Sequence, residues 1–282
     1  MWRGAAMAPE SNNQDRALWR HAHGPQLPCV PCGIVSGLVM TGALNPWDRA
    51  LYLSVVHRTS FFDRSNWQHP FRGILQTVGQ RGLSSGLYFP LEEACSRWTS
   101  SAVVGGQLAG IINGAMLNPI ALVKHQNWGS KEGASFVETS MHLYRYAGLK
   151  VFTHGLAVTM CRDAIFGFCF SLRKTAWHCQ DERGAFAASM VFAALGTVLS
   201  SPFNYIRNIT YASILASDGT SRSMRRRVEA LLLEFAADVR RQETPLRSAQ
   251  FVQERLKLGW GSFRVAVGMA MLDFAYSACC RF

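Results

Sequence analysis

The chain has 282 residues, of which 49% are hydrophobic and 17% are charged, and its formal net charge is +11. Its mean hydropathy of +0.04 is ordinary for a soluble protein, so the distribution of apolar residues along the chain is more informative than the total. A basic excess can serve nucleic acids, but the sequence has no motif that combines aromatic and basic residues for their recognition. We therefore expect no nucleic-acid partner.

Residues suited to catalysis or metal binding are not gathered in the sequence. The eight histidines are dispersed, no glycine-rich phosphate loop precedes a helix, and no carboxylates are paired at a useful spacing. Cys29 and Cys32 have two-residue spacing, yet no second pair or histidine completes a zinc site. We predict no enzyme activity, no cofactor and no metal.

The first 31 residues are polar and carry both charge signs. This segment lacks the apolar stretch of a secretory signal, and Glu10 and Asp15 make it a poor arginine-rich transit peptide. We expect a flexible polar tail over 1–31, so import into a mitochondrion would depend on internal signals.

One helix pattern then occurs three times in the chain. In each copy two small residues stand thirteen and nine positions before a proline: Gly33, Gly37 and Pro46; Gly106, Gly110 and Pro119; Ser189, Ala193 and Pro202. Small residues four apart let helices approach closely in lipid, and a proline kinks a membrane helix whose freed backbone groups find other partners. The prolines recur after 73 and 83 residues, which predicts three related units, 32–98, 99–180 and 181–282. A soluble helical repeat array is the alternative.

The second and third copies lie in long stretches without charge. Thr99–Val123 and Gly184–Ile206 run for 25 and 23 residues, beyond the roughly 18 that indicate a transmembrane helix. Weaker candidates contain a few charged residues: Cys32–Val56, Gly73–Trp98, Val151–Leu172 and Gly259–Cys280. Such charges normally face a bundle interior or a water-filled cavity. We predict an all-α membrane protein with three tandem two-helix repeats, which form a six-transmembrane-helix pseudo-threefold bundle.

The segments between these helices predict short surface helices on one side of the membrane. Ser135–Arg145 and Val228–Val239 have apolar residues at helical spacing, and the second lies in an expanded segment, 221–254. Arginines concentrate in this segment, as the positive-inside rule and binding to anionic lipid would explain. We expect an anionic lipid such as cardiolipin as a partner.

The repeats resemble the mitochondrial carrier family. Its members have Pro-x-acid-x-x-base, often with a glutamine two residues further, at the end of each odd-numbered helix, and Gly-x-x-x-aromatic-x-base-Gly before each even-numbered helix. The middle repeat matches best, with Pro119-Ile-Ala-Leu-Val-Lys124-His-Gln126 and then Gly148-Leu-Lys-Val-Phe152-Thr-His154-Gly155. The outer repeats depart more, with Pro46-Trp-Asp48-Arg-Ala-Leu51, which leaves little room for a surface helix, and Pro202-Phe-Asn204-Tyr-Ile-Arg207, followed late by Gly259-Trp260-Gly261.

The resemblance implies a gate of ion pairs on the matrix side. Of three possible pairs only Asp48 with Lys124 has both charges, and it could equally be a constitutive bridge. Ala121 offers no carboxylate to Arg207, which we expect to turn to Asn204, Gln126, a backbone carbonyl or a lipid headgroup. The gate residues are therefore Asp48, Lys124, Gln126, Asn204 and Arg207, and the helix kinks are Pro46, Pro119 and Pro202.

The resemblance also implies that residues of the even-numbered helices contact substrate in a central cavity. The matching positions are Arg81, Arg162, Asp163 and Arg264. Buried guanidinium groups bind carboxylate or phosphate, so the expected solute is a small anionic or zwitterionic metabolite. An internal network of these arginines with Asp163 or the backbone is the alternative. At the other end of the cavity, Glu92 and Arg173 do not complete a second charged ring.

Two functions follow as hypotheses. The first is a multi-pass solute carrier of the mitochondrial inner membrane that works by alternating access. The second is a carrier-fold protein that no longer transports and serves as a structural subunit of a respiratory or other inner-membrane complex, with the other subunits as its partners.

Overall fold

The computed structural model describes residues 30–129, 135–176, 182–214 and 221–280. These residues form helices joined by short connections, with no strand among them. The predicted tail, 1–31, lies outside the described residues except for its last two positions. The elements are α2 (Val30–Val56), η1 (Arg64–Trp67), α3 (Ile74–Thr99), α4 (Ala102–Gly129), α5 (Phe136–Ala147), η2 (Gly148–Thr153), α6 (Leu156–Ala176), α7 (Glu182–Ala212), α8 (Ser221–Arg240), α9 (Pro245–Leu256) and α10 (Leu258–Cys280).

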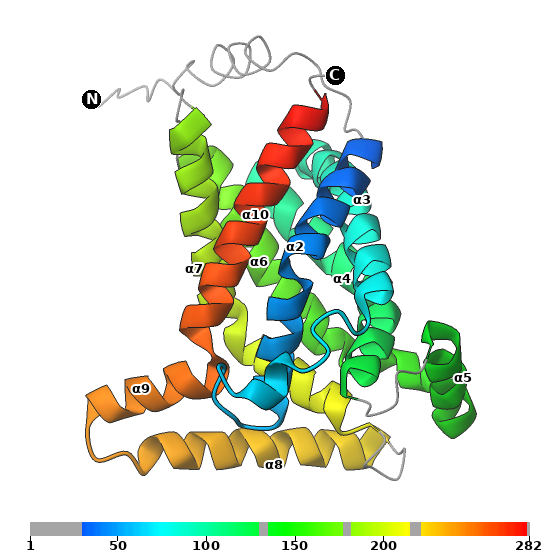
Figure 1. The fold of residues 1–282 in the computed structure, drawn as a ribbon. Coiled ribbons are helices and arrows are strands. Elements are labelled where there is room, and N and C mark those ends of the chain that lie inside the picture. The colour runs from blue at the N-terminus through cyan, green and yellow to red at the C-terminus, as the bar shows by residue number, and fades with distance from the viewer. Residues whose placement is uncertain (1–29, 130–134, 177–181, 215–220, 281–282) are drawn as a thin grey trace, which may run out of the picture.

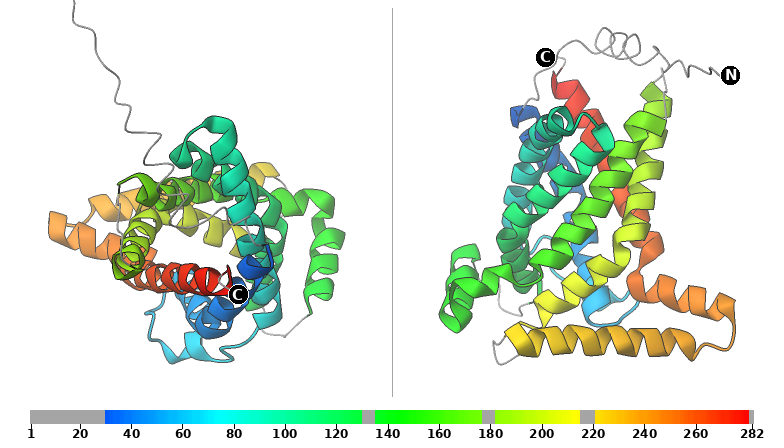
Figure 2. Two further views of the ribbon diagram at one scale, coloured as in Figure 1. Left: turned by 90° about the horizontal axis from the view of Figure 1, so that it is seen from above. Right: turned by 180° about the vertical axis from the view of Figure 1, so that it is seen from behind.

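Six long helices pack side by side in a closed ring (Figure 1). Each contacts the next in the order α2, α3, α4, α6, α7 and α10, and α10 closes the ring by packing on α2. Figure 2 shows the ring from above and from behind. The shorter helices lie at one end of it: α5 projects to the side, and α8 and α9 run transverse to the ring helices (Figure 1).

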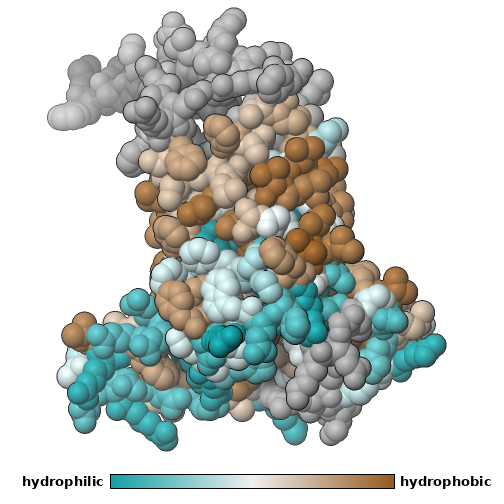
Figure 3. Space-filling model, viewed as in Figure 1, coloured by the Kyte–Doolittle hydropathy of each residue, from teal (hydrophilic) through white to brown (hydrophobic). Residues whose placement is uncertain are grey.

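Two of the ring helices are long and apolar enough to cross a membrane. They are Ala102–Gly129 and Phe186–Ala212, and the pair Phe136–Thr153 and Leu156–Arg173, bent by 47°, adds a third if it is counted as one span. Figure 3 shows hydrophobic residues gathered over the upper part of the ring, and hydrophilic residues toward the end that carries α8 and α9. An exposed apolar surface of this kind is expected where helices face lipid. The prediction of an all-helical protein with helices able to span a membrane is therefore confirmed.

The predicted surface helices form close to where the sequence placed them. Ser135 caps α5: its hydroxyl accepts from the Glu138 backbone N–H, and the Glu138 carboxylate accepts from the Ser135 backbone N–H. Hydrogen bonding to the Ser135 backbone N–H lowers the pKa of Glu138. The expanded segment holds both α8 and α9, whereas the first connection contains only the short η1.

Small residues of the repeated pattern bring neighbouring helices into close contact. A Cβ atom added at Gly33 would lie 2.7 Å from the Ser85 carbonyl oxygen of α3, and one at Gly37 would lie 2.8 Å from the Arg81 carbonyl oxygen. The second copy repeats this arrangement, since Gly106 and Gly110 lie against the carbonyl groups of Gly167 and Asp163 on α6. In the third copy Ser189 and Ala193 are fully buried. The predicted packing role of the two pairs of glycines is confirmed.

This packing predicts opposite effects for two glycines of α2. Gly37→Ala should destabilise the protein by about 1–3 kcal/mol, because the new methyl group would overlap the backbone of α3. Gly42→Ala is the matched control: apart from its chain neighbours and the backbone of its own helix, no atom lies within 4 Å of its added Cβ, and alanine favours a helix over glycine by about 0.5–1 kcal/mol. The midpoint of thermal unfolding should fall for the first variant and hold or rise for the second. Equal midpoints would contradict the close contact.

The second, fourth and sixth helices of the ring, α3, α6 and α10, begin in the same way. Gly73 and Gly155 both have φ of +71°, and Lys257 has φ of +52°. In each case the backbone N–H four residues later donates to the carbonyl of the positive-φ residue, at 3.0, 2.8 and 2.8 Å. The residue that corresponds to Gly73 and Gly155 is therefore Lys257, and the sequence-based placement of this motif at Gly259–Gly261 is wrong. A lysine was missed because glycine is the usual residue in this conformation.

Each repeated proline lies inside a continuous helix: Pro46 in α2, Pro119 in α4 and Pro202 in α7. The side chain of the preceding asparagine connects the first two of these helices to the chain ahead of the next helix. Asn45 Nδ2 donates to the Pro70 carbonyl at 3.0 Å, and Asn118 Nδ2 donates to the Phe152 carbonyl at 2.8 Å. In the third copy Ser201 Oγ instead donates to Val198 of its own helix.

Candidate functional site: the central cavity

A cavity of about 290 Å³ lies inside the ring, and residues of all six ring helices line it. The four predicted substrate-binding residues lie along its wall, together with most of the predicted gate: Asp48, Arg81, Lys124, Arg162, Asp163, Asn204, Arg207 and Arg264. The sequence thus identified the residues that the fold brings together. Their pairing differs from the prediction.

Asp48 connects three helices of the ring. Its carboxylate accepts a hydrogen bond from Arg264 of α10 and lies 3.6 Å from Arg81 Nη2 of α3. The Arg264 side chain is only 3% exposed. Asp48 is therefore the shared ionic partner of two guanidinium groups at the seam between α3, α2 and α10, where one positive charge stays in excess.

The expected pair of Asp48 with Lys124 is not formed: within the described ranges, no carboxylate lies within 4.0 Å of the Lys124 ammonium group. The reason lies in the order of the ring. The neighbours of α2 are α3 and α10, and each supplies an arginine, whereas Lys124 is on α4, which is not a ring neighbour of α2. Lys124 is nonetheless buried, and its ammonium group lies 4.6 Å from the centre of the Trp128 ring, a contact that stabilises a cation.

Arg207 binds within its own helix. It donates to Asn204 Oδ1 at 2.7 Å and to Asn208 Oδ1 at 3.3 Å, so the prediction that it turns to Asn204 is confirmed. Gln126 of α4 donates to the backbone carbonyl of Tyr211 in α7. This hydrogen bond connects α4 and α7 without an ion pair.

Arg162 and Asp163 bind each other. Arg162 Nε donates to Asp163 Oδ1 at 2.6 Å, as in the internal network that the sequence left open. About a quarter of the Arg162 side chain is still exposed, and both residues line the cavity. The pair can therefore contact a solute while its own charges balance.

Asn118 forms a buried polar network that the sequence analysis missed. Its Oδ1 accepts from Tyr211 Oη at 2.7 Å and from Thr159 Oγ1 at 3.0 Å, while its Nδ2 donates to backbone carbonyls before α6. All three side chains are buried, so the network joins α4, α6 and α7. The recurrence of Asn-Pro at 45–46 and 118–119 was the available signal, but only the proline was given a role.

At the opposite end of the ring, Glu92 and Arg173 make buried polar contacts. Glu92 accepts from Ser171 Oγ of α6 at 2.8 Å, and Arg173 donates to Ser189 of α7. The side chains of α3, α6 and α7 are thus connected at this end as well.

No protein-family model and no curated protein matches the chain. Its function has to be inferred from the charges of the cavity. Two of the charged side chains that line it are carboxylates, Asp48 and Asp163, and six are cationic: Arg81, Lys124, Arg162, Arg207, Lys257 and Arg264. Among the described residues, no group of three or more histidines, cysteines and carboxylates could hold a metal. This excess of positive charge favours an anionic ligand in the cavity.

Proposed function

We propose that the chain is a solute carrier of the mitochondrial inner membrane, related to the mitochondrial carrier family, that moves a small anionic or zwitterionic metabolite by alternating access. The observation that carries the proposal is the cavity itself. Every helix of the ring lines it, and cationic side chains exceed carboxylates there by six to two. A buried cationic excess is costly without a counter-ion, and an anionic solute would supply one.

The proposal includes an architecture of three repeats and six transmembrane helices. Two features support it: the glycine contacts of α2 with α3 recur between α4 and α6, and α3, α6 and α10 begin at a positive-φ residue with the same backbone hydrogen bond. In the closed ring, the two helices of each pair contact each other and also contact one helix of each neighbouring pair. The repeats would be α2 with α3, α4 with α6, and α7 with α10.

In this proposal the solute competes with Asp48 for its arginines. A carboxylate or phosphate group that binds Arg81 and Arg264 weakens their hold on Asp48 and so loosens the contact between α2 and its two neighbours. The hydrogen bond of Gln126 to the Tyr211 carbonyl would help to close the matrix side, and it separates more easily than an ion pair. Arg207 stays bound within α7. An anionic lipid such as cardiolipin would bind the basic connecting segments.

A structural subunit that does not transport is the second candidate. The internal pairing of Arg162 with Asp163 favours it, because this pair is balanced without a solute. In that case α8 and α9 would offer a surface to other subunits of an inner-membrane complex.

Exchange of labelled anions by the full-length protein in lipid vesicles tests the proposal. Dicarboxylates, phosphate and amino acids should reveal at least one exchanged solute, and Arg162→Ala should reduce its uptake by about tenfold or more, the effect of losing one charge-assisted hydrogen bond. Arg97→Ala is the control, since Arg97 is exposed on α3 and pairs with Glu93 away from the cavity. Exchange of none of these solutes, together with stoichiometric co-purification with a large complex, would support the structural subunit instead.

A further inference from the structure

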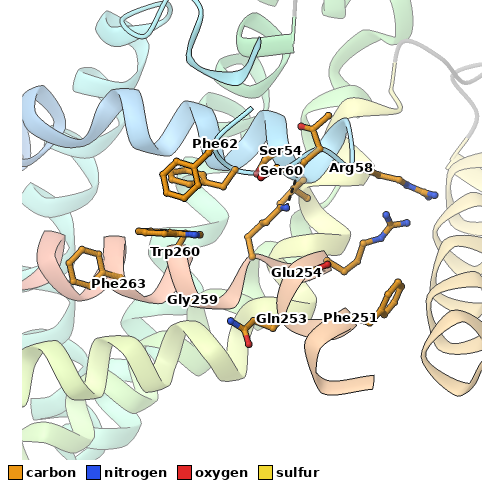
Figure 4. A pocket seen from close by; sticks show the side chains of 15 residues that line it. Ser54, Arg58, Ser60, Phe62, Phe251, Gln253, Glu254, Gly259, Trp260 and Phe263 are labelled. Carbon is orange, nitrogen blue, oxygen red and sulfur yellow. Dashed lines mark hydrogen bonds between the residues drawn. The ribbon is translucent and has the colours of Figure 1, made fainter. Parts of the chain in front are cut away.

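A second cleft lies outside the ring, where α9 and the start of α10 face the end of α2 and the loop after it (Figure 4). Its volume is about 730 Å³, within the range of roughly 300–1,000 Å³ that is usual for small-molecule sites. Lys257 fixes the two walls relative to each other, because its ammonium group donates to the Thr59 carbonyl at 2.8 Å. Burial lowers the pKa of Lys257.

One end of the cleft is a cluster of aromatic rings. Trp260 stacks on Phe61 with ring centres 5.3 Å apart, and Phe62 meets Trp260 edge-on at 5.0 Å. Trp47 supports the cluster from behind, through contacts with Phe61, Trp260 and Phe263. The cluster is held in place yet open to solvent, since Phe62 is 66% and Phe263 is 52% exposed. Exposed ring faces of this kind can stack with any nucleotide base, because every base has an aromatic face.

The other end of the cleft carries charge. Figure 4 shows Arg58 and Glu254 at the end away from Phe62, Trp260 and Phe263. Arg58 forms a half-exposed ion pair with Glu234 at 3.3 Å. Arg255 also lines the cleft, and its Nε is buried without a hydrogen-bond partner. A buried donor without a partner is costly, and the Arg255 guanidinium group, as part of the lining, adds positive charge at this end of the cleft.

We propose that this cleft binds a nucleotide. The base would stack on the aromatic cluster, the phosphates would bind Arg255 and Arg58, and the Glu254 carboxylate would accept hydrogen bonds from the ribose hydroxyl groups. Glu254 is the one carboxylate that lines the cleft, against three cationic side chains, Arg58, Arg255 and Lys257. Lys257 and Val55 border both the cleft and the central cavity, whereas Arg58, Arg255 and the aromatic cluster line only the cleft. Binding at this site does not depend on transport.

The test is direct binding of ADP, adenosine and inorganic phosphate to the purified full-length protein in detergent. ADP should bind more tightly than either fragment, because only ADP reaches both ends of the cleft. Arg255→Gln should weaken ADP binding by about tenfold or more, the effect of losing one charge-assisted hydrogen bond. Arg247→Gln is the matched control, because Arg247 is on the same helix and pairs with Glu243 outside the cleft.

Two further measurements separate this site from others. Arg162→Ala should leave ADP affinity unchanged; if it abolishes binding while Arg255→Gln does not, the nucleotide occupies the central cavity and the proposal is wrong. No ADP binding at millimolar concentration by protein that unfolds cooperatively would also overturn it. Binding only to vesicles that contain anionic phospholipid, without binding to ADP, would assign the cleft to a lipid headgroup.

Discussion

Asp48→Asn is expected to destabilise the protein by about 3–5 kcal/mol, because it leaves the buried guanidinium group of Arg264 without its counter-ion. Arg264 loses the carboxylate that accepts its hydrogen bond, and Arg81 loses its nearest negative charge. The midpoint of thermal unfolding in detergent measures the effect. Anion exchange, if the protein is a carrier, should be lost in the same variant.

Glu93→Gln is the matched control for Asp48→Asn. It also removes a carboxylate from an arginine, Arg97, but this pair lies on the surface of α3 with side chains 43% and 74% exposed. Exposed ion pairs contribute at most about 1 kcal/mol. The double variant of Asp48→Asn with Arg264→Gln should recover part of the loss, since it removes one of the two stranded charges. A loss no larger than that of the control would mean that Asp48 is not the counter-ion of this seam.

Asn118→Ala should have the second large effect, a loss of about 3 kcal/mol or more. The change removes the acceptor of Tyr211 and Thr159 and the donor to the Phe152 carbonyl, and each buried polar group left without a partner costs about 1–3 kcal/mol. Because the three partners lie on different segments, unfolding should also become less cooperative. Thermal unfolding followed by circular dichroism measures both quantities.

Two milder variants show whether the Asn118 network acts as a unit. Tyr211→Phe removes a single donor to Asn118 and should cost about 1 kcal/mol. Asn45→Ala removes one hydrogen bond, to Pro70, and should also cost less than Asn118→Ala. If Asn118→Ala were no worse than Asn45→Ala, the additional partners of Asn118 would contribute nothing.

The sequence predicted the helices from periodic patterns, and it predicted the residues of the cavity from the resemblance to the carrier family. Apolar runs and small residues at fixed distances from a proline identify a packed helix face, and α2 and α4 show that face against α3 and α6. Charged residues inside apolar helices almost always face the interior, and the resemblance to the carrier family indicated Arg81, Arg162 and Arg264 as the ones that line the cavity.

The ionic partners within the cavity could not be predicted in the same way. The motif that places an acid and a base three residues apart indicates which residues would meet in a symmetric gate. It does not indicate which cation lies nearest to Asp48. That depends on the order of the helices in the ring. Because α3 and α10 are the neighbours of α2, their residues Arg81 and Arg264 lie within ion-pair distance of Asp48, whereas Lys124 on α4 does not. Lys257 was missed for another reason, because a lysine rarely adopts the positive φ that glycine adopts freely.

The side chain of Ser201 affects how long the connection between α7 and α10 can be. Asn45 and Asn118 each donate a hydrogen bond to the chain just before the next ring helix, and this bond fixes the end of that connection. Ser201 instead donates to a carbonyl of α7 itself. The entry to α10 is instead held by Lys257 on the loop of the first repeat. At the position before Pro202, no asparagine side chain thus fixes the connection between α7 and α10. It is there that the protein accommodates two additional helices and should best accept an inserted tag or domain.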